Sequence, residues 1–360
     1  MDQEARFGRP FPRGRLTAGL AAAALLAVAG FSIIGCGGQG GDVDEKSMVY
    51  GSPPAKVTTG EAPAADLYSG MGLSEAPEVK PAPTAPVQDV RIDVTHTAIT
   101  VADGVTFTAW TFGGTVPGPV LHVRQGDRIR FAMTNRSDQT MSLTMPMPHA
   151  IDFHAAMVNP VDKYQPIAPG ATLRFEWVAN YPGVFMYHCS MPPMLQHLAY
   201  GMYGMVIVDP KEGYPTRPDR EYAIVQSELY LTKSKGGGME VDMDAVKRKA
   251  PTYVVFNGKP NRHVTEPLTA KPGERVRLYV LNAGPNGTSS FHVVGTLLDR
   301  VWIDGNPMNQ MRGMQTVLLG ASSGAIVEFV VPEAGIYTFV DHEFADAESG
   351  AMGHINALAP

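Results

Sequence analysis

Short runs of alternating apolar and polar residues recur along the chain from about residue 90 onward. Residues 90–101 (VRIDVTHTAITV) and 105–112 (VTFTAWTF) show this alternation, as do residues 120–135 and 171–178. A period of two places successive side chains on opposite faces of a β-strand. The turn-forming stretches GGTVPGP and APG separate the runs. Because few segments show a helical period, the pattern predicts short β-strands joined by tight turns.

The strand pattern occurs twice. Residues 120–135 resemble residues 267–282, and residues 168–189 resemble residues 321–342. Two similar units of about 120–140 residues with closely spaced short strands predict two Greek-key β-sandwiches in tandem. We therefore expect an all-β protein built from two sandwiches of this kind.

The N-terminal region has the composition of an export signal. Four arginines precede an uncharged apolar stretch from Leu16 to Ile34, and Gly35 stands immediately before Cys36. These features are typical of an exported protein, and a small residue followed at once by cysteine resembles a bacterial lipoprotein signal. An uncleaved membrane anchor is the alternative. Residues 36–87 are rich in Gly, Pro, Ala and acidic residues, which predicts a tether without a core.

These observations predict a division of the chain and a location. We expect a lipoprotein signal peptide over residues 1–35, a tether over 36–87, a first sandwich over 88–212 and a second over 213–360. The body is expected outside the cytoplasm, anchored through a lipid on Cys36 to a membrane that faces the periplasm or the cell exterior. The net charge of −6 gives no electrostatic case for nucleic-acid binding.

One of the two cysteines stands beside a histidine. Cys189 ends the stretch GVFMYHC, His197 and Met202 follow it, and His149 lies upstream in MPMPHAIDFHA. One thiolate, two imidazoles and a thioether are the ligands of a blue-copper electron-transfer site. A lone histidine or methionine is more often a core residue, but four such residues in this order favour a copper site.

Strand alternation predicts a second group of metal-binding side chains behind the first. If GVFMYHC and HAIDFH are strands, Cys189 and His149 point into the sandwich. His188, His154 and Asp152 then point to the opposite face. Two histidines are too few to hold a catalytic metal well, because three are usual.

Most of the chain resembles the two-domain copper-containing nitrite reductases. The stretches PHAIDFHAA, GVFMYHC, HLAYGMYGMVIVDP, TSSFHVVG and FVDH occur in the order that this family shows. The short interval between Cys189 and His197 resembles a branch that includes membrane-anchored lipoproteins, in agreement with Cys36. The chain departs from the family at residues 157–170, which replace a glycine-rich loop, and at Ala150, where asparagine is common.

The resemblance implies a role for each candidate residue. It implies that a type 1 copper is bound by His149, Cys189, His197 and Met202. It implies that a type 2 copper is bound by His154, His188 and His342, of which His342 comes from a neighbouring subunit. Asp152 and His292 are implied as catalytic proton donors, and Val294 is implied as a residue that shapes the pocket. The type 2 site then exists only in a homotrimer. The resemblance further implies that electrons pass from the type 1 copper through the adjacent Cys189 and His188 to the type 2 copper, where nitrite is reduced to nitric oxide. The implied electron donor is a small cupredoxin or a c-type cytochrome.

Two other classes of protein remain open at this point. The first is an exported electron-transfer or copper-holding protein without nitrite turnover, which needs no second metal group. The second is a two-domain laccase, a multicopper oxidase that needs paired His-x-His motifs, and the chain contains none. Four histidines have no role that the sequence predicts: His96, His122, His263 and His354.

Overall fold

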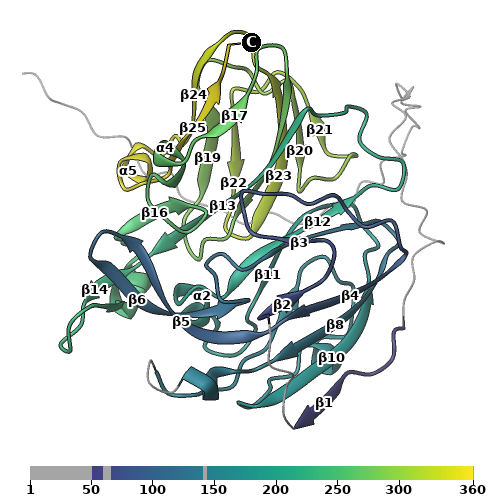
Figure 1. Ribbon diagram of the computed structural model, residues 1–360, viewed down its shortest axis with the longest axis vertical. Helices are drawn as coiled ribbons and strands as arrows, with labels where there is room; N and C mark the ends of the chain where they lie inside the picture. The colour runs from purple at the N-terminus through teal and green to yellow at the C-terminus, as the bar shows by residue number, and fades with distance from the viewer. Residues whose placement is uncertain (1–50, 60–65, 141–143, 360) are drawn as a thin grey trace, which may run out of the picture. The chain divides into compact units, whose positions relative to one another are not determined.

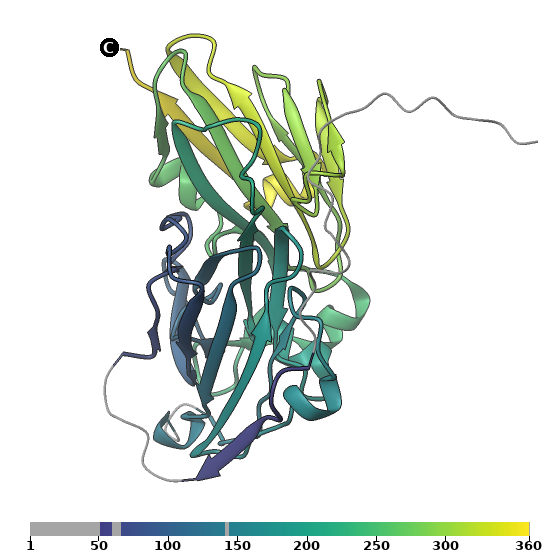
Figure 2. The same ribbon diagram turned by 90° about the vertical axis from the view of Figure 1, so that its right-hand side faces the viewer.

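The computed structural model describes residues 51–59, 66–140 and 144–359. They form two successive β-sandwiches, which confirms the predicted fold class (Figures 1 and 2). The described ranges contain no helix that is both long enough and apolar enough to cross a membrane. The predicted signal peptide and Cys36 lie outside these ranges.

The first half contains twelve strands and three short helices within the described ranges. Their bounds are β1 (Lys56–Thr59), β2 (Tyr68–Ser69), β3 (Leu73–Ser74), β4 (Val87–Ile92), β5 (Val94–Ala102), β6 (Val105–Phe112), β7 (Val120–Arg124), β8 (Arg128–Thr134), the 3-10 helix η2 (Ser137–Thr140), β9 (Asp152–Phe153), α1 (Pro160–Lys163), β10 (Ala171–Val178), β11 (Gly183–His188), α2 (Met194–Ala199) and β12 (Tyr203–Asp209).

The second half continues with strands and three further short helices. Their bounds are β13 (Arg220–Leu229), β14 (Leu231–Lys233), β15 (Met239–Val241), α3 (Met243–Arg248), β16 (Tyr253–Phe256), α4 (Arg262–Thr265), β17 (Leu268–Ala270), β18 (Arg275–Asn282), β19 (Ser289–Val293), β20 (Arg300–Ile303), β21 (Gln310–Met311), β22 (Thr316–Leu319), β23 (Ser323–Val330), β24 (Gly335–Asp341), α5 (Phe344–Glu348) and β25 (Met352–Ala357).

Two five-stranded sheets enclose the core of the first half. One has the order β1-β10-β8-β4-β2 and the other β3-β7-β12-β11-β9. Strand β4 shows why the alternating sequence folds this way, because Gln88, Val90 and Ile92 are buried and the residues between them are more exposed. Phe131 and Trp177 lie at the centre of this core.

The second half repeats the plan with a six-stranded and a five-stranded sheet. Their orders are β16-β13-β18-β23-β20-β21 and β17-β25-β24-β19-β22. Phe291 and Phe339 lie in the core between them. Every residue of β18 from Val276 to Asn282 is buried. A strand covered on both faces has a nearly continuous apolar sequence, and β18 shows this pattern.

The two halves share an apolar interface. Val184 and Met186 of β11 pack in one buried cluster with Tyr279 and Trp302 of the second half. The Val184 N–H also donates to the Asp304 carbonyl at 2.7 Å. Strand β11 is therefore covered on both faces along most of its length, and it ends beside both groups of candidate metal ligands. On the side of the second half it packs against strands β23 and β18, and Figure 1 shows it below β23.

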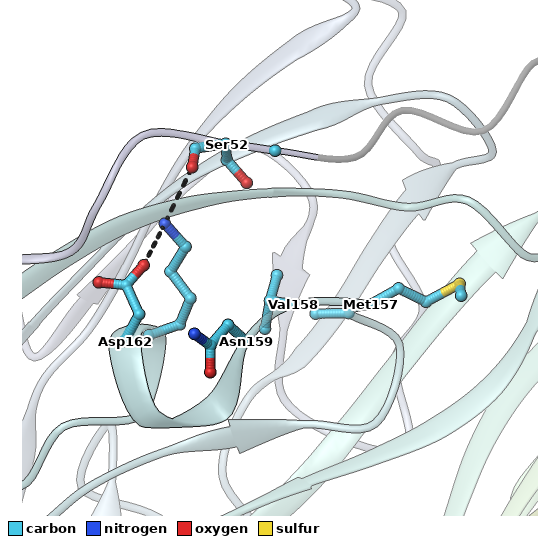
Figure 3. A pocket seen from close by; sticks show the side chains of 8 residues that line it. Ser52, Met157, Val158, Asn159 and Asp162 are labelled. Atoms are coloured by element: carbon cyan, nitrogen blue, oxygen red, sulfur yellow. Dashed lines mark hydrogen bonds and ion pairs between the residues drawn. The ribbon is translucent and has the colours of Figure 1, made fainter.

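Part of the segment expected to be a tether is folded. Strand β1 pairs with β10, β3 pairs with β7, and Leu73 is buried. The Lys163 amine donates to the Ser52 carbonyl at 3.2 Å and contacts Asp162 at 3.0 Å (Figure 3). Pieces of two to four residues that lie along existing strands have no periodicity of their own. The sequence pattern therefore does not reveal them.

Candidate metal centres

Cys189, His149 and His197 meet inside the first sandwich. Cys189 follows β11 directly, His197 lies on α2, and His149 is bridged to Ile167 by two backbone hydrogen bonds. Cys189 Sγ is 3.2 Å from His197 Nδ1 and 4.0 Å from His149 Nδ1. The two Nδ1 atoms are 3.2 Å apart. Three buried donor atoms that converge in this way are suited to one metal ion.

Met202 closes the loop that carries two of these residues. Its N–H donates to the His197 carbonyl at 3.1 Å, and its carbonyl accepts from the Cys189 N–H at 3.1 Å. Its side chain is fully buried. The backbone thus holds Cys189, His197 and Met202 together, as the sequence predicts for a fourth, thioether ligand.

Burial disfavours the charged form of all three titratable groups of this cluster. It lowers the pKa of His149 to about 2 and that of His197 to about 4. It raises the pKa of Cys189 to about 11, although the Ala150 N–H donates to Sγ at 3.5 Å and opposes the shift. Two neutral imidazoles and a thiol that needs a cation to replace its proton fit a soft metal such as copper.

A close packing contact orients the strand that leads to Cys189. Tyr187 of β11 lies opposite Gly204 of β12, and its hydroxyl donates to the Pro119 carbonyl at 2.8 Å. A Cβ atom at Gly204 would stand 2.3 Å from the Tyr187 ring. Glycine is therefore required there, because only it lets the ring lie across β12.

Asp152, His154 and His188 form a second group that is more exposed. The Nε2 atoms of His188 and His154 are 3.1 Å apart, and an Asp152 oxygen is 3.9 Å from His188 Nε2. Strand β9 places Asp152 directly opposite His188 of β11. His188 Nδ1 donates to the Cys189 carbonyl at 3.0 Å, which leaves its Nε2 lone pair free for a metal. Burial and the neighbouring His188 lower the pKa of His154.

The burial of these residues agrees with the predicted strand alternation. His149 and Cys189 are fully buried, whereas Asp152 and His188 are partly exposed and His154 is exposed. The two groups are joined by the single peptide bond between His188 and Cys189.

His292 and His342 lie together in the second half and not with the group just described. Their ring centroids are 4.9 Å apart, on β19 and just after β24. In the described part of the chain, the metal-binding group around His154 contains no residue of the second half. Val294 is 47% exposed and lies two residues beyond His292. The structure therefore places the predicted site residues in three groups. The third group, formed by His292 and His342 with Val294 nearby, lies apart from the other two within one chain.

Comparison with known proteins gives the family. The multicopper oxidase family models match residues 93–213 and 220–357. A copper-containing nitrite reductase of Neisseria meningitidis serogroup B is 39% identical over 306 residues, which cover 82% of this chain and 75% of the relative. The chain belongs to the copper-containing nitrite reductase family. As a member of this family it is a copper-dependent oxidoreductase.

Solved structures of this family have the same fold. A copper nitrite reductase of Nitrosomonas europaea superposes with a TM-score of 0.67 at 39% identity, covering 75% of this chain and 94% of that one. A copper-containing nitrite reductase of Thermus scotoductus SA-01 gives a TM-score of 0.69 at 33% identity, covering 75% and 61%. In this copper nitrite reductase, His149, Cys189, His197 and Met202 form the type 1 copper site. The exposed group of Asp152, His154 and His188 is consistent with the type 2 site.

Two residues that contact these groups were not predicted from the sequence. The Tyr164 hydroxyl donates to the Phe153 carbonyl at 3.0 Å, and burial together with the charge of Asp152 raises its pKa. Tyr164 lies in residues 157–170, the segment that departs from the family pattern, and this departure was the only available signal. His96 contacts His149 inside the type 1 site, and no spacing in the sequence links them.

Proposed function

We propose that this chain catalyses the one-electron reduction of nitrite to nitric oxide and water, with two protons consumed. The adjacency of His188 and Cys189 carries the proposal. Cys189 belongs to a buried set of ligand atoms suited to a copper ion that accepts and releases one electron. His188 belongs to an exposed group of side chains that substrate can reach. A protein that only transfers electrons needs no second group one peptide bond away.

The exposed group is proposed to hold the type 2 copper with His154, His188 and His342, the last from a neighbouring subunit. These residues would hold a copper ion that would supply Lewis-acid polarisation of nitrite and the electron for its reduction. Two imidazoles from one chain leave the ligand set incomplete, since three protein ligands are usual in a catalytic site. The separation of His342 from His154 within one chain supports the proposal that the site is assembled from two subunits.

The proposed assembly is a homotrimer, and exposed apolar side chains near His292 and His342 support a subunit contact at this face. Phe344 is 69% exposed, and its ring lies 5.2 Å from that of His342. Leu318, on the strand that pairs with β19, is 67% exposed, and Val294 is also exposed. Apolar side chains gathered on one face mark a protein contact surface. We propose that this face covers the His154 and His188 group of the next subunit.

Asp152 and His292 are proposed to deliver the two protons. The Asp152 carboxylate is partly exposed and close to His188 Nε2, so it can take a proton from solvent and pass it to a nitrite oxygen. His292 of the neighbouring subunit would supply the second proton. A carboxylate and an imidazole are suited to this exchange near neutral pH. Val294 is proposed to shape the pocket above the metal.

The remaining sequence-based expectations are part of the same proposal. A small cupredoxin or a c-type cytochrome would donate the electron at the type 1 copper. Export, lipidation of Cys36 and anchoring to a membrane rest on the N-terminal sequence alone. The boundary between residues 212 and 213 lies in the connection between β12 and β13.

Direct detection of nitric oxide tests the proposed function. The full copper-loaded chain is given nitrite and a chemical reductant, and copper per subunit is counted in the same preparation. We expect nitric oxide from a protein that holds two coppers per subunit. A trimer that holds two coppers per subunit and forms no nitric oxide would contradict the proposal. One copper per subunit without nitric oxide would favour the electron-transfer alternative.

A further inference from the structure

His96 lies beside the type 1 copper ligands without being one of them. It is fully buried on β5, and its Nε2 atom is 3.0 Å from Nε2 of His149. His149 uses its other nitrogen, Nδ1, to face Cys189 and His197. The two histidines therefore meet through the side of the His149 ring that points away from the metal position.

This geometry determines which nitrogen atoms carry protons. Nδ1 of His149 must present a lone pair to copper, so the proton of its neutral ring is on Nε2. That N–H points at His96 Nε2, which must accept, and His96 then carries its own proton on Nδ1. A metal-ligating histidine commonly donates its second N–H to an acceptor that orients the ring and raises its basicity.

Packing alone does not account for a histidine at this position. The His96 Nδ1 atom is buried and has no hydrogen-bond partner among the described residues. An unpaired buried N–H is unfavourable, so an apolar side chain of similar volume would fill the same space better. The Trp110 ring stacks on His96 at 5.6 Å between centroids, and it also contacts the His197 ring at 4.9 Å. The ring of His96 is thus held firmly against the copper ligands.

We propose that His96 is a positioning residue for the type 1 copper. By accepting from His149 Nε2–H it fixes the tautomer and orientation of that ligand and raises its basicity. A more basic ligand favours oxidised copper, so His96 lowers the reduction potential of the site. The inference rests on the type 1 copper site and not on nitrite turnover, so either can fail without the other.

Three variants of the full chain test this role. His96→Met removes the acceptor and keeps an apolar side chain of similar volume. His96→Gln keeps an acceptor near the position of Nε2, whereas the shorter amide of His96→Asn cannot reach His149. Type 1 copper affinity is measured by titration with a competing chelator and followed by the blue absorption band. The reduction potential is measured on the same copper-loaded samples.

We expect His96→Met and His96→Asn to bind type 1 copper about 10- to 100-fold more weakly, with a higher potential. His96→Gln should restore most of the affinity and the parent potential. The comparison between Gln and Asn holds even if the methionine variant does not fold. As a matched control, His263→Met replaces another buried histidine and should leave the blue band and the potential unchanged.

Several outcomes would overturn the inference. One is a His96→Met protein with the parent affinity and potential. Another is a His96→Gln protein as impaired as His96→Asn. A shift of the same size in the His263→Met control would show that the effect is not specific to the contact with His149.

Discussion

Asp152 has a place that suits proton delivery better than metal binding. Its carboxylate is 3.9 Å from His188 Nε2, farther than the contact between His188 and His154, and the side chain is partly open to solvent. The Tyr164 hydroxyl lies close enough for the Asp152 charge to raise the pKa of that tyrosine. Removing the charge of Asp152 should therefore change proton transfer more than copper binding.

Asp152→Asn should slow nitric oxide formation at neutral pH by about two orders of magnitude, the usual scale for losing a proton donor. Copper content and the blue band should be retained, because no proposed ligand is removed. Initial rates of nitric oxide formation and copper counts check both expectations. Asp103→Asn, at an exposed position between β5 and β6, is the matched control and should keep the parent rate. Full turnover by Asp152→Asn would contradict the assigned role.

His263 should make stability depend on pH. Burial lowers the pKa of His263 to about 4, although its hydrogen bond to the Glu266 carbonyl acts in the opposite direction. The His263 Nε2 atom is 2.9 Å from the Asn257 side-chain amide. The unfolded chain, with a histidine pKa near 6.5, therefore binds the proton more tightly than the folded protein. The contribution of His263 to stability is complete above about pH 6.5 and is lost progressively toward pH 4, by about 3 kcal/mol in total.

The measurement is the free energy of unfolding of the copper-loaded protein at pH 7.5 and at pH 4.5. His263→Gln should show a smaller loss between these two values than the parent does, because the glutamine does not titrate. His354→Gln replaces a less buried histidine in the same half and should lose as much stability as the parent. Equal losses in the parent and in His263→Gln would contradict this prediction.

The site residues that the sequence revealed are those with unusual chemistry at short spacing. Cys189 beside His188 is visible in one stretch, and strand alternation then assigns each to its own group. His96 gave no such signal, because it meets His149 across 53 positions of sequence. Contacts of this kind depend on how strands pack, which the local pattern does not contain.

At the scale of elements, alternation predicted the two faces of β11 but not what covers them. Cys189 is buried and His188 is partly exposed, as expected. Val184 and Met186, on the same face as His188, are nevertheless buried by the second half. The alternation gives the direction of a side chain, whereas its exposure depends on the neighbouring sandwich.

The folded part of the expected tether shows a second limit of pattern reasoning. A segment rich in Gly, Pro and Ala cannot form a core of its own, but it can add short strands to an existing sheet. The Lys163 amine donates to the carbonyls of Ser52 and Pro53. The alternation of apolar and polar residues does not reveal this contact. The Lys163 side chain is only 4% exposed.

Lys163→Met should release the segment around β1 from the loop that contains α1. The two carbonyl groups would lose their charged donor, at a cost of about 1–3 kcal/mol. Limited proteolysis followed by mass spectrometry should show faster cleavage within residues 51–59. Lys211→Met, at an exposed lysine, is the control and should be cleaved at the parent rate. An unchanged cleavage rate in Lys163→Met would show that the contact does not hold the segment.

At the scale of the whole molecule, the internal repeat explains how the two halves differ. The repeat aligns the end of β24 with the end of β11, and His342 lies just beyond this strand end in the second half. The second half has no cysteine and cannot form a type 1 site of its own. His292 and His342 of this half instead lie near exposed apolar side chains, where they can reach another subunit.

Subunit mixing tests the shared site most directly. His154→Ala and His342→Ala each remove one proposed ligand of the type 2 copper, and either protein alone should form almost no nitric oxide. When the two are co-expressed in equal amounts, about a quarter of the interfaces pair an intact His154 with an intact His342. We predict that the mixed trimers recover about that fraction of the parent rate of nitric oxide formation. A mixture no more active than its separate parents would contradict a catalytic site shared between subunits.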